Sequence, residues 1–277
     1  MVTWTLIQKQ RLQELNASEE QLGQSFNNEK ERNSCYQETE KQLVSKAKED
    51  LERYRSERKE PPLVTMEAKL SEALVEAGFS RVSTPILLSR GLLEKMQITE
   101  EHSLFKQVFW IDEKKCLRPM LAPNLYYLLK DLLRIWEHPV SIFEIGPCFR
   151  KDTQGSSHLQ EFTMLNLVEM GLPEAECKSR LEQLAALIMS SAGLNDYDIE
   201  TESSEVYGST IDVVAGGCEA GSGAIGPHPL DSHWGVDVPW AGIGFGLERL
   251  VMLKEGYNNI QKAARSLTYL NGIRLNI

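Results

Sequence analysis

The sequence lacks several features that would assign it to a familiar class of protein. No apolar run approaches the ~20 residues that a membrane-spanning helix needs, so no membrane segment is expected. The N-terminal residues show no charged start followed by an apolar stretch, so no signal peptide is expected either. The five cysteines are scattered and include no Cys-x-x-Cys pair, which favours reduced thiols over a disulfide framework. We therefore expect a cytoplasmic protein.

The common kinds of catalytic and metal site are also missing. Cys218, His228 and His233 are the candidates for a zinc site, but their spacing matches no standard zinc pattern. The sequence has no arrangement of a nucleophile with a histidine and an acid, and no P-loop, internal repeat or low-complexity tract. If the protein binds a nucleotide, another motif must hold the phosphates.

Positive charge is scarce for a protein that binds nucleic acid. The net charge is −10, whereas phosphate contacts come from lysine and arginine. Residues 1–60 carry 11 basic against 12 acidic side chains, and the remainder carries 19 against 28. The N-terminal segment is thus densely charged but nearly neutral. An acidic average is compatible with a local basic face, but it argues against tight, unspecific RNA binding.

The N-terminal 60 residues contain no proline and only one glycine, Gly23, which is a composition typical of helices. We predict helices over about 5–16 and 28–59, the second with acidic and basic residues mixed along it as in a solvated helix. Pro61 and Pro62 interrupt this pattern. We predict a helical extension over residues 1–62 and a second domain over 63–277.

Residues 63–277 alternate between helical and strand patterns, and an amphipathic stretch ends at Gly193. Consecutive strands joined by short turns predict an antiparallel sheet with helices packed on it, an α+β fold. We predict helices over about 64–77, 121–136, 172–192 and from Leu247, and strands near 80–85, 107–111, 115–118, 140–150, 160–170, 196–202, 206–214, 217–226 and 241–247.

Two segments about 100 residues apart indicate a site for ATP. The first, FEIGPCFRKDTQGSSHLQEF, is predicted to form two strands with Arg150 ending the first and Phe162 opening the second. The second, GIGFGLER, has glycines at every other position of a strand and then Arg249 at the start of a helix. Such glycines leave one face of a strand bare for a flat ligand. Two arginines beside it suit phosphate oxygens, because guanidinium is always charged and forms paired hydrogen bonds.

Two further patterns suggest an apolar pocket. After Arg118, four residues fall at helical spacing on one face, which is typical of a buried wall. On the strand that begins at Phe162, alternate residues share a face, and Asn166 is the polar one among apolar neighbours. A buried amide needs a partner, and a substrate carbonyl would serve. No acidic residue shares that face, so a cationic substrate side chain is not expected. The two sets are Ala122, Leu125, Tyr126 and Leu129, and Phe162, Met164, Asn166 and Val168.

The two ATP segments resemble motifs 2 and 3 of the class II aminoacyl-tRNA synthetases, and GFSRVSTPILL, with Gly78 and Pro85, is similar to their motif 1. The resemblance implies a Mg²⁺-dependent reaction with ATP and a homodimer formed through the motif-1 region. It also implies roles for individual residues. Arg150 and Arg249 would be catalytic and bind ATP, with Asp152, His158, Leu159 and Phe162 as further ATP-binding residues and Glu219 and Ser222 as ATP-binding residues and metal ligands.

Within that class, several segments over about residues 63–277 resemble the catalytic domain of the pyrrolysyl-tRNA synthetase family. They are LRPMLAPNLYYLL, FEIGPCFRKD, EFTMLNLVEMG, VYGSTIDV, GPHPLD, PWAGIGFGLERL and ARSLTYLNG. The resemblance implies activation of pyrrolysine and its transfer to the 3′-terminal adenosine of the cognate tRNA. In it, Asn166 would bind the side-chain amide carbonyl and Tyr207 would cap the pyrroline ring. The remaining pocket residues would be Ala122, Leu125, Tyr126, Leu129, Val168, Ala224 and Trp240.

The sequence departs from this family in two places. Asp152 stands where many class II enzymes have glutamate. Small residues at 221, 223 and 224 would widen the pocket floor unless neighbouring side chains refill it, and the sequence leaves both open. The chain is similar to the bacterial arrangement, in which a further tRNA-binding domain is a separate protein. Residues 1–62 would then be a tRNA-binding extension, with basic side chains such as Arg53 and Arg55.

Two other functions stay open. One is a class II synthetase for another large neutral amino acid, which Asn166 disfavours because an aromatic side chain would leave its amide unpaired. The other is a catalytically silent, synthetase-like protein that binds tRNA or regulates another enzyme. Retention of Arg150, Glu219, Ser222 and Arg249 disfavours it.

Overall fold

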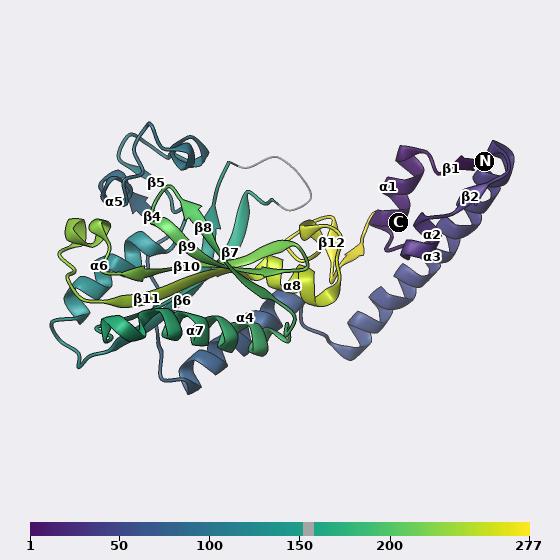
Figure 1. The fold of residues 1–277 in the computed structure, drawn as a ribbon. Coiled ribbons are helices and arrows are strands. Elements are labelled where there is room, and N and C mark those ends of the chain that lie inside the picture. Colours follow the sequence, from purple (N-terminus) through teal and green to yellow (C-terminus); the bar gives the residue numbers. More distant parts are fainter. Residues whose placement is uncertain (152–157) are drawn as a thin grey trace.

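The computed structural model describes residues 1–151 and 158–277. In Figure 1 a small helical unit, in purple and blue, projects from a larger unit built around a sheet. No helix among these residues is long and apolar enough to cross a membrane. The small unit consists of β1 (Val2–Thr3), α1 (Leu6–Glu14), α2 (Glu19–Leu22), β2 (Ser25–Phe26) and α3 (Glu29–Glu57).

The helices of the small unit begin at well-formed caps. Thr5 and Ser18 each form a reciprocal capping pair with the glutamine three residues later, and the Asn28 side chain accepts from the amide of Glu31. The predicted helices over 5–16 and 28–59 therefore match α1 and α3 within two residues. The unit has a core of its own, made of Trp4, Leu12, Leu15, Leu22, Phe26 and Leu43.

The larger unit is organised by a seven-stranded sheet with the order β3-β6-β7-β11-β10-β9-β8. Every pairing is antiparallel except that of β3 with β6, so the predicted α+β class is confirmed and the sheet is mixed at one edge. The strands are β3 (Ser80–Arg81), β6 (Val140–Phe149), β7 (Glu161–Met170), β8 (Asp198–Ser204), β9 (Gly208–Ala215), β10 (Cys218–Gly226) and β11 (Trp240–Gly246).

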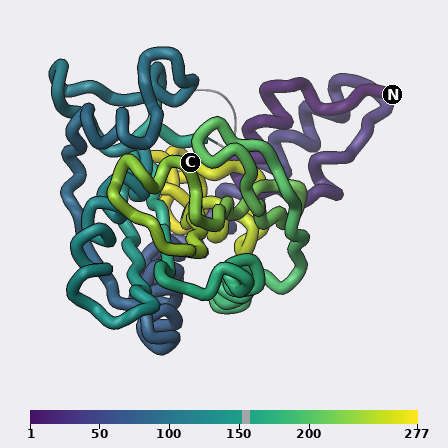
Figure 2. The backbone as a smooth tube through the Cα atoms, turned by 60° about the vertical axis from the view of Figure 1, so that its left-hand side comes forward, coloured from purple at the N-terminus to yellow at the C-terminus, as the bar shows by residue number. Residues whose placement is uncertain are grey.

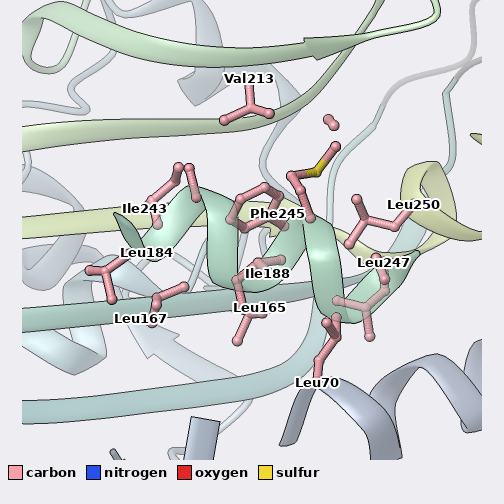
Figure 3. Packing of buried hydrophobic residues seen from close by; sticks show 14 of the residues in the cluster. Leu70, Leu165, Leu167, Leu184, Ile188, Val213, Ile243, Phe245, Leu247 and Leu250 are labelled. Atoms are coloured by element: carbon pink, nitrogen blue, oxygen red, sulfur yellow. The ribbon is translucent and has the colours of Figure 1, made fainter. Parts of the chain in front are cut away.

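One face of the sheet is covered by α4 (Pro62–Glu76), α7 (Cys177–Ala192) and α8 (Leu247–Glu255). Figure 3 shows Leu184 and Ile188 of α7 packed against side chains of β7 and β11. Helix α7 ends at Gly193, whose φ of 78° is a left-handed conformation that glycine adopts at little cost. The labelled members of this buried face are Leu70, Leu165, Leu167, Leu184, Ile188, Val213, Ile243, Phe245, Leu247 and Leu250.

The opposite face is enclosed by shorter elements that the sequence predicted less well. The segment near 107–111 is not a strand. A single bridge joins Trp110 to Cys116, because the preceding residues turn into a short 3-10 helix. The predicted helix over 121–136 ends at Leu132. These elements are β4 (Leu87–Ser89), α5 (Arg90–Lys95), η1 (Ser103–Gln107), β5 (Lys115–Leu117), α6 (Ala122–Leu132) and η3 (Pro229–Trp234).

The chain closes with η4 (Ile260–Lys262), β12 (Tyr269–Leu270) and β13 (Ile273–Arg274). This last segment, yellow in Figure 1, runs from the sheet unit back to the small helical unit. The first and the last residues of the sheet unit therefore both lead to the helical unit. Figure 2 shows the helical unit standing away from the sheet unit in a second view.

Candidate active site

A cavity of about 570 Å³ lies on the sheet face opposite α7, a size typical of small-molecule sites. It gathers almost every residue that the sequence pointed to. Asp152 lies outside the described residues. The predicted residues that line the cavity are Ala122, Leu125, Tyr126, Leu129, Arg150, His158, Leu159, Phe162, Asn166, Val168, Tyr207, Glu219, Ser222, Ala224, Trp240 and Arg249.

Arg150 follows the last residue of β6 and is oriented by the neighbouring backbone. Its Nε donates to the Pro119 carbonyl at 3.0 Å, and its guanidinium carbon lies 5.3 Å from the centre of the Phe162 ring. The arginine and the aromatic ring thus share one end of the cavity, as the two-strand prediction required. A planar base and a phosphate could both be contacted there.

A buried ion pair supports the backbone around Arg150. Arg118 is 2% exposed, and its Nη1 lies 2.7 Å from Glu144 Oε1. Glu144 also accepts from the Thr84 amide and hydroxyl, and Arg118 Nε donates to the Pro147 carbonyl. Gly146 leaves the space that the guanidinium occupies. The end of motif 1 is thereby tied to the strand that carries Arg150, and breaking this pair would leave an uncompensated buried charge.

A bulge in β10 brings the two predicted metal ligands to one face. Residues three apart on a regular strand point to opposite sides. The register with β9 shifts between Glu219 and Gly221, so the extra residue Ala220 restores Ser222 to the face of Glu219. Ser222 Oγ donates to Asp212 Oδ1 at 2.6 Å, which adds a carboxylate beside the pair. This all-oxygen set suits a hard divalent cation.

Arg249 stands at the start of α8 and faces Glu219. Its Nη1 lies 2.9 Å from the Glu219 carbonyl and 3.4 Å from Glu219 Oε1. The preceding residue, Glu248, is buried and accepts the Thr163 amide at 2.9 and 2.8 Å. Burial raises the pKa of Glu248, and the hydrogen bonds from Thr163 partly oppose that shift. Glu248 therefore links the helix that carries Arg249 to the beginning of strand β7 by hydrogen bonds.

The apolar end of the cavity is held by Asp231. This carboxylate is 2% exposed and accepts from the Tyr126 hydroxyl at 2.8 Å, the Trp240 indole at 2.8 Å and the His228 amide at 2.7 Å. The polar atoms of Tyr126 and Trp240 are thus satisfied outside the cavity. Burial, together with nearby Tyr207 and Asp231, raises the pKa of Tyr126, which keeps the phenol neutral. The result is an aromatic, uncharged wall.

Asn166 lies between this wall and Arg150. Its Oδ1 is buried and has no hydrogen-bond partner among residues 1–151 and 158–277. Gly244, opposite it on β11, makes room for the amide, because an added Cβ would lie 3.0 Å from Asn166 Oδ1. An unpaired buried oxygen in a cavity invites a ligand that carries a hydrogen-bond donor, and the Nδ2 of the same carboxamide can donate to an acceptor.

Tyr207 closes the cavity from the turn between β8 and β9. Its ring packs edge-on against Trp240 and His228, with centroids 6.1 and 5.6 Å away. His228 Nε2 lies 3.1 Å from the Tyr207 carbonyl, and Glu205 of the same turn accepts from the Ser103 hydroxyl at 2.8 Å. Burial raises the pKa of Tyr207, so its hydroxyl remains a neutral donor.

The small residues of β10 do not act together. Gly221 and Gly223 face the covered side: an added Cβ would meet Phe245 at Gly221, and Leu181 Cδ1 at 3.0 Å at Gly223. At these two positions side chains of the covered face occupy the space beside the strand, while the backbone of both glycines still borders the cavity. Ala224 is a buried small side chain that lines the cavity.

The candidate zinc residues make other contacts in the structure. Among residues 1–151 and 158–277 there is no group of three or more histidine, cysteine, aspartate or glutamate side chains that could hold a metal. Cys218 instead donates to the Glu219 carbonyl, and His233 Nδ1 lies 3.0 Å from the Lys95 carbonyl.

Sequence reasoning missed three carboxylates, Asp212, Asp231 and Glu248. Glu248 and Asp231 stand inside the quoted segments GIGFGLER and GPHPLD, but their burial follows from contacts with residues far along the chain. Asp212 could have been found by pairing β9 with β10, had the bulge at Ala220 been foreseen.

Comparisons with known proteins agree with this geometry. Residues 48–271 match the family described as the tRNA synthetases class II core domain (F). The crystal structure of pyrrolysyl-tRNA synthetase from Desulfitobacterium hafniense is 52% identical, with a TM-score of 0.94 over 99% of each chain. A threonine–tRNA ligase of Wolbachia sp. subsp. Brugia malayi (strain TRS) is 29% identical over 34% of this chain. The ATP phosphoribosyltransferase regulatory subunit of Alkaliphilus metalliredigens (strain QYMF) is 23% identical over 54% of it. The chain spans 15% and 38% of these two curated relatives, respectively.

Proposed function

Because the chain belongs to the class II tRNA synthetases, and by its 52% identity over 99% of both chains to the pyrrolysyl-tRNA synthetase family, we propose that it activates pyrrolysine with ATP and transfers it to tRNA. Residues 63–277 would be the catalytic domain. The five cysteines are free, which is consistent with a cytoplasmic location.

The observation that carries the substrate assignment is the unpaired side-chain oxygen of Asn166 beside the apolar wall of the cavity. Pyrrolysine has a long aliphatic arm with one amide and ends in an uncharged ring. Its amide could use both ends of the Asn166 carboxamide, while the arm lies against Leu125, Leu129 and Val168. A purely aromatic amino acid would leave Asn166 unsatisfied, which costs about 1–3 kcal/mol.

In the first reaction a carboxylate oxygen of the amino acid attacks the α-phosphorus of ATP. The bond between the α-phosphorus and the bridging oxygen breaks, and pyrophosphate leaves with the electron pair. Charge grows on the phosphoryl oxygens, so a fixed guanidinium beside them lowers the barrier. Arg150 would supply it at the α-phosphate, Arg249 would hold the distal phosphates, and Phe162 would stack on adenine.

In the second reaction a ribose hydroxyl of the 3′-terminal adenosine attacks the activated carbonyl. The carbon–oxygen bond to the phosphate breaks, AMP leaves, and the hydroxyl proton is released. No side chain becomes acylated, which agrees with the lack of a nucleophile paired with histidine and acid. Positioning of the tRNA end is then the main contribution of the protein.

Mg²⁺ fits the oxygen set at the β10 bulge. Glu219 and Ser222 would hold it, with Asp212 behind Ser222 and phosphate oxygens completing the coordination. When bound, the ion would neutralise phosphate charge. Glu219, which is bonded to Arg249, would keep the arginine and the cation at one end of the cavity.

Three partner proposals accompany this function. Residues 1–62 would bind tRNA, although Arg53 and Arg55 each pair with a carboxylate of their own helix, Asp50 and Glu52. A homodimer would form near motif 1, where Ile86 and Leu87 are 42% and 53% exposed. A separate protein that binds the same tRNA would complete the system.

The test is ATP–pyrophosphate exchange against pyrrolysine, Nε-acylated lysines and the standard amino acids. We expect exchange with pyrrolysine and bulky acyl-lysines and none with the standard set. Exchange with a standard amino acid would keep the class and reject the substrate. Silence across the panel, with ATP and Mg²⁺ still bound, would favour a regulatory protein like the matched regulatory subunit.

A further inference from the structure

The N-terminal helical unit meets the sheet unit at two separate places. One is the covalent passage from α3 to α4, where Arg58 takes a left-handed conformation with φ 51°. The other is the C-terminal segment, whose Ile277 packs against the core of the helical unit. A body held at two points has a defined orientation, whereas a body held at one could swing.

Lys262 lies at the second junction and is only 5% exposed. Its Nζ is 2.9 Å from the Gln13 carbonyl, 2.6 Å from Asn16 Oδ1 and 2.9 Å from Asn258 Oδ1. The first two acceptors belong to the helical unit and the third to the sheet unit. The three N–H groups of one ammonium thus satisfy three acceptors across the boundary.

The other contacts of this junction surround Lys262 without neutralising it. Glu14 of α1 is paired with Arg274 of β13 at 2.7 Å, and Asn16 Nδ2 donates to the Gly272 carbonyl at 3.1 Å. Arg11 Nη1 donates to the Asn276 carbonyl at 3.1 Å. Burial lowers the pKa of Lys262 to about 8, and the nearby Glu14 opposes that shift. A buried ammonium with neutral acceptors makes an orientation-dependent joint, because each hydrogen bond needs its own direction.

Helix η4, which contains Lys262, also reaches the active-site cavity. Ile260, the first residue of η4, lines the cavity, and Lys262 is its last residue. Helix η4 in turn packs against α8, which begins beside Arg249. The joint to the helical unit and the cavity wall are therefore parts of the same three-residue helix.

We propose that Lys262 is a positioning residue that fixes the N-terminal helical unit relative to the cavity, so that bound tRNA presents its 3′ end there. This inference rests on the proposed function, with the helical unit as a tRNA-binding extension. Lys262 is not among the residues that line the cavity. It should matter for transfer to tRNA and not for amino-acid activation.

The experiment compares the two reactions in Lys262→Met, which keeps the length of the side chain and removes its donors. Transfer to tRNA should fall about 10-fold or more, the loss expected for hydrogen bonds to a charged group. Pyrophosphate exchange without tRNA should stay within about 2-fold of wild type, because the cavity itself is unchanged. Lys254→Met, the same change at an exposed position of α8, is the matched control and should alter neither reaction.

A second variant guards against misfolding of the first. Asn16 has a φ of 64°, so Asn16→Gly keeps the backbone conformation while removing two of the junction contacts. It should show the same selective loss, with a wider molecule in small-angle scattering. Equal losses in both reactions, or no loss in either, would overturn the role of Lys262. Absence of exchange in the wild-type chain would overturn both this inference and the proposed function.

Discussion

The two faces of the seven-stranded sheet are built from the same strands but serve opposite needs. On β7, Leu165 and Leu167 face α7 and are at most 1% exposed, while Asn166 between them faces the cavity. On β11, Ile243 is buried on the first face and Gly244 leaves space on the second. The period of two keeps packing and chemistry on alternate residues, so each can change with little effect on the other.

The largest test of this separation is Arg150→Ala, which removes charge from the cavity face alone. We expect exchange to fall by at least about 100- to 1,000-fold, since a fixed donor at the reacting phosphate is lost. The thermal unfolding midpoint should stay close to wild type, because the Arg118–Glu144 pair remains intact. Retained activity in this variant would reject the motif-2 assignment.

A matched pair of glycine substitutions separates the two faces directly. Gly223→Ala places a methyl group 3.0 Å from the Gly242 carbonyl and Leu181 on the covered face, and should destabilise the fold by about 1–3 kcal/mol. Gly244→Ala places one 3.0 Å from Asn166 Oδ1, and should raise the KM for pyrrolysine about 10-fold with a stability change below about 1 kcal/mol.

Urea unfolding and exchange kinetics on both variants provide the measurement. If the two substitutions had the same pattern of effects, the faces would not be independent.

The smallest expected effect is that of Tyr207→Phe, which keeps the ring and removes its hydroxyl. We expect kcat/KM for pyrrolysine to fall about 10-fold, because the pyrroline ring loses a hydrogen-bond donor, and to change less than about 3-fold for a simple acyl-lysine. Exchange kinetics with the two substrates measure the difference. Equal losses on both would remove Tyr207 from the cap.

The covered face was more predictable from the sequence than the cavity. The period of α7, its terminal glycine and the strands that include Leu165 and Ile243 follow from local patterns. The prediction of a strand near 107–111 was wrong, because the 3-10 helix that begins at Ser103 overrides the β propensity of this segment. Elements α5 and β4 were missed for the same reason: short segments take their form from packing.

The cavity was predictable where alternation decides it and not where an irregularity does. Asn166 and Phe162 share the predicted face. Glu219 and Ser222 share a face only because of the bulge at Ala220, and no residue type in β10 predicts that bulge. The same shift in register turns the missing side chains of Gly221 and Gly223 toward the core, which the sequence alone could not decide. The roles of individual residues in binding ATP and the amino acid stay predictions.

The strand order has a consequence for the timing of folding. Strand β7 lies between β6, its neighbour in sequence, and β11, which is synthesised about 70 residues later at ribosomal rates of about 5–20 residues per second. A nascent chain can therefore form the hairpin that carries Arg150 while Arg249 is still being made. Pairing β11 with β7 closes a long loop. This step is slow, because the loss of chain entropy comes before the contacts that compensate for it. ATP, which needs both arginines, can stabilise the nearly complete chain but not its earlier fragments.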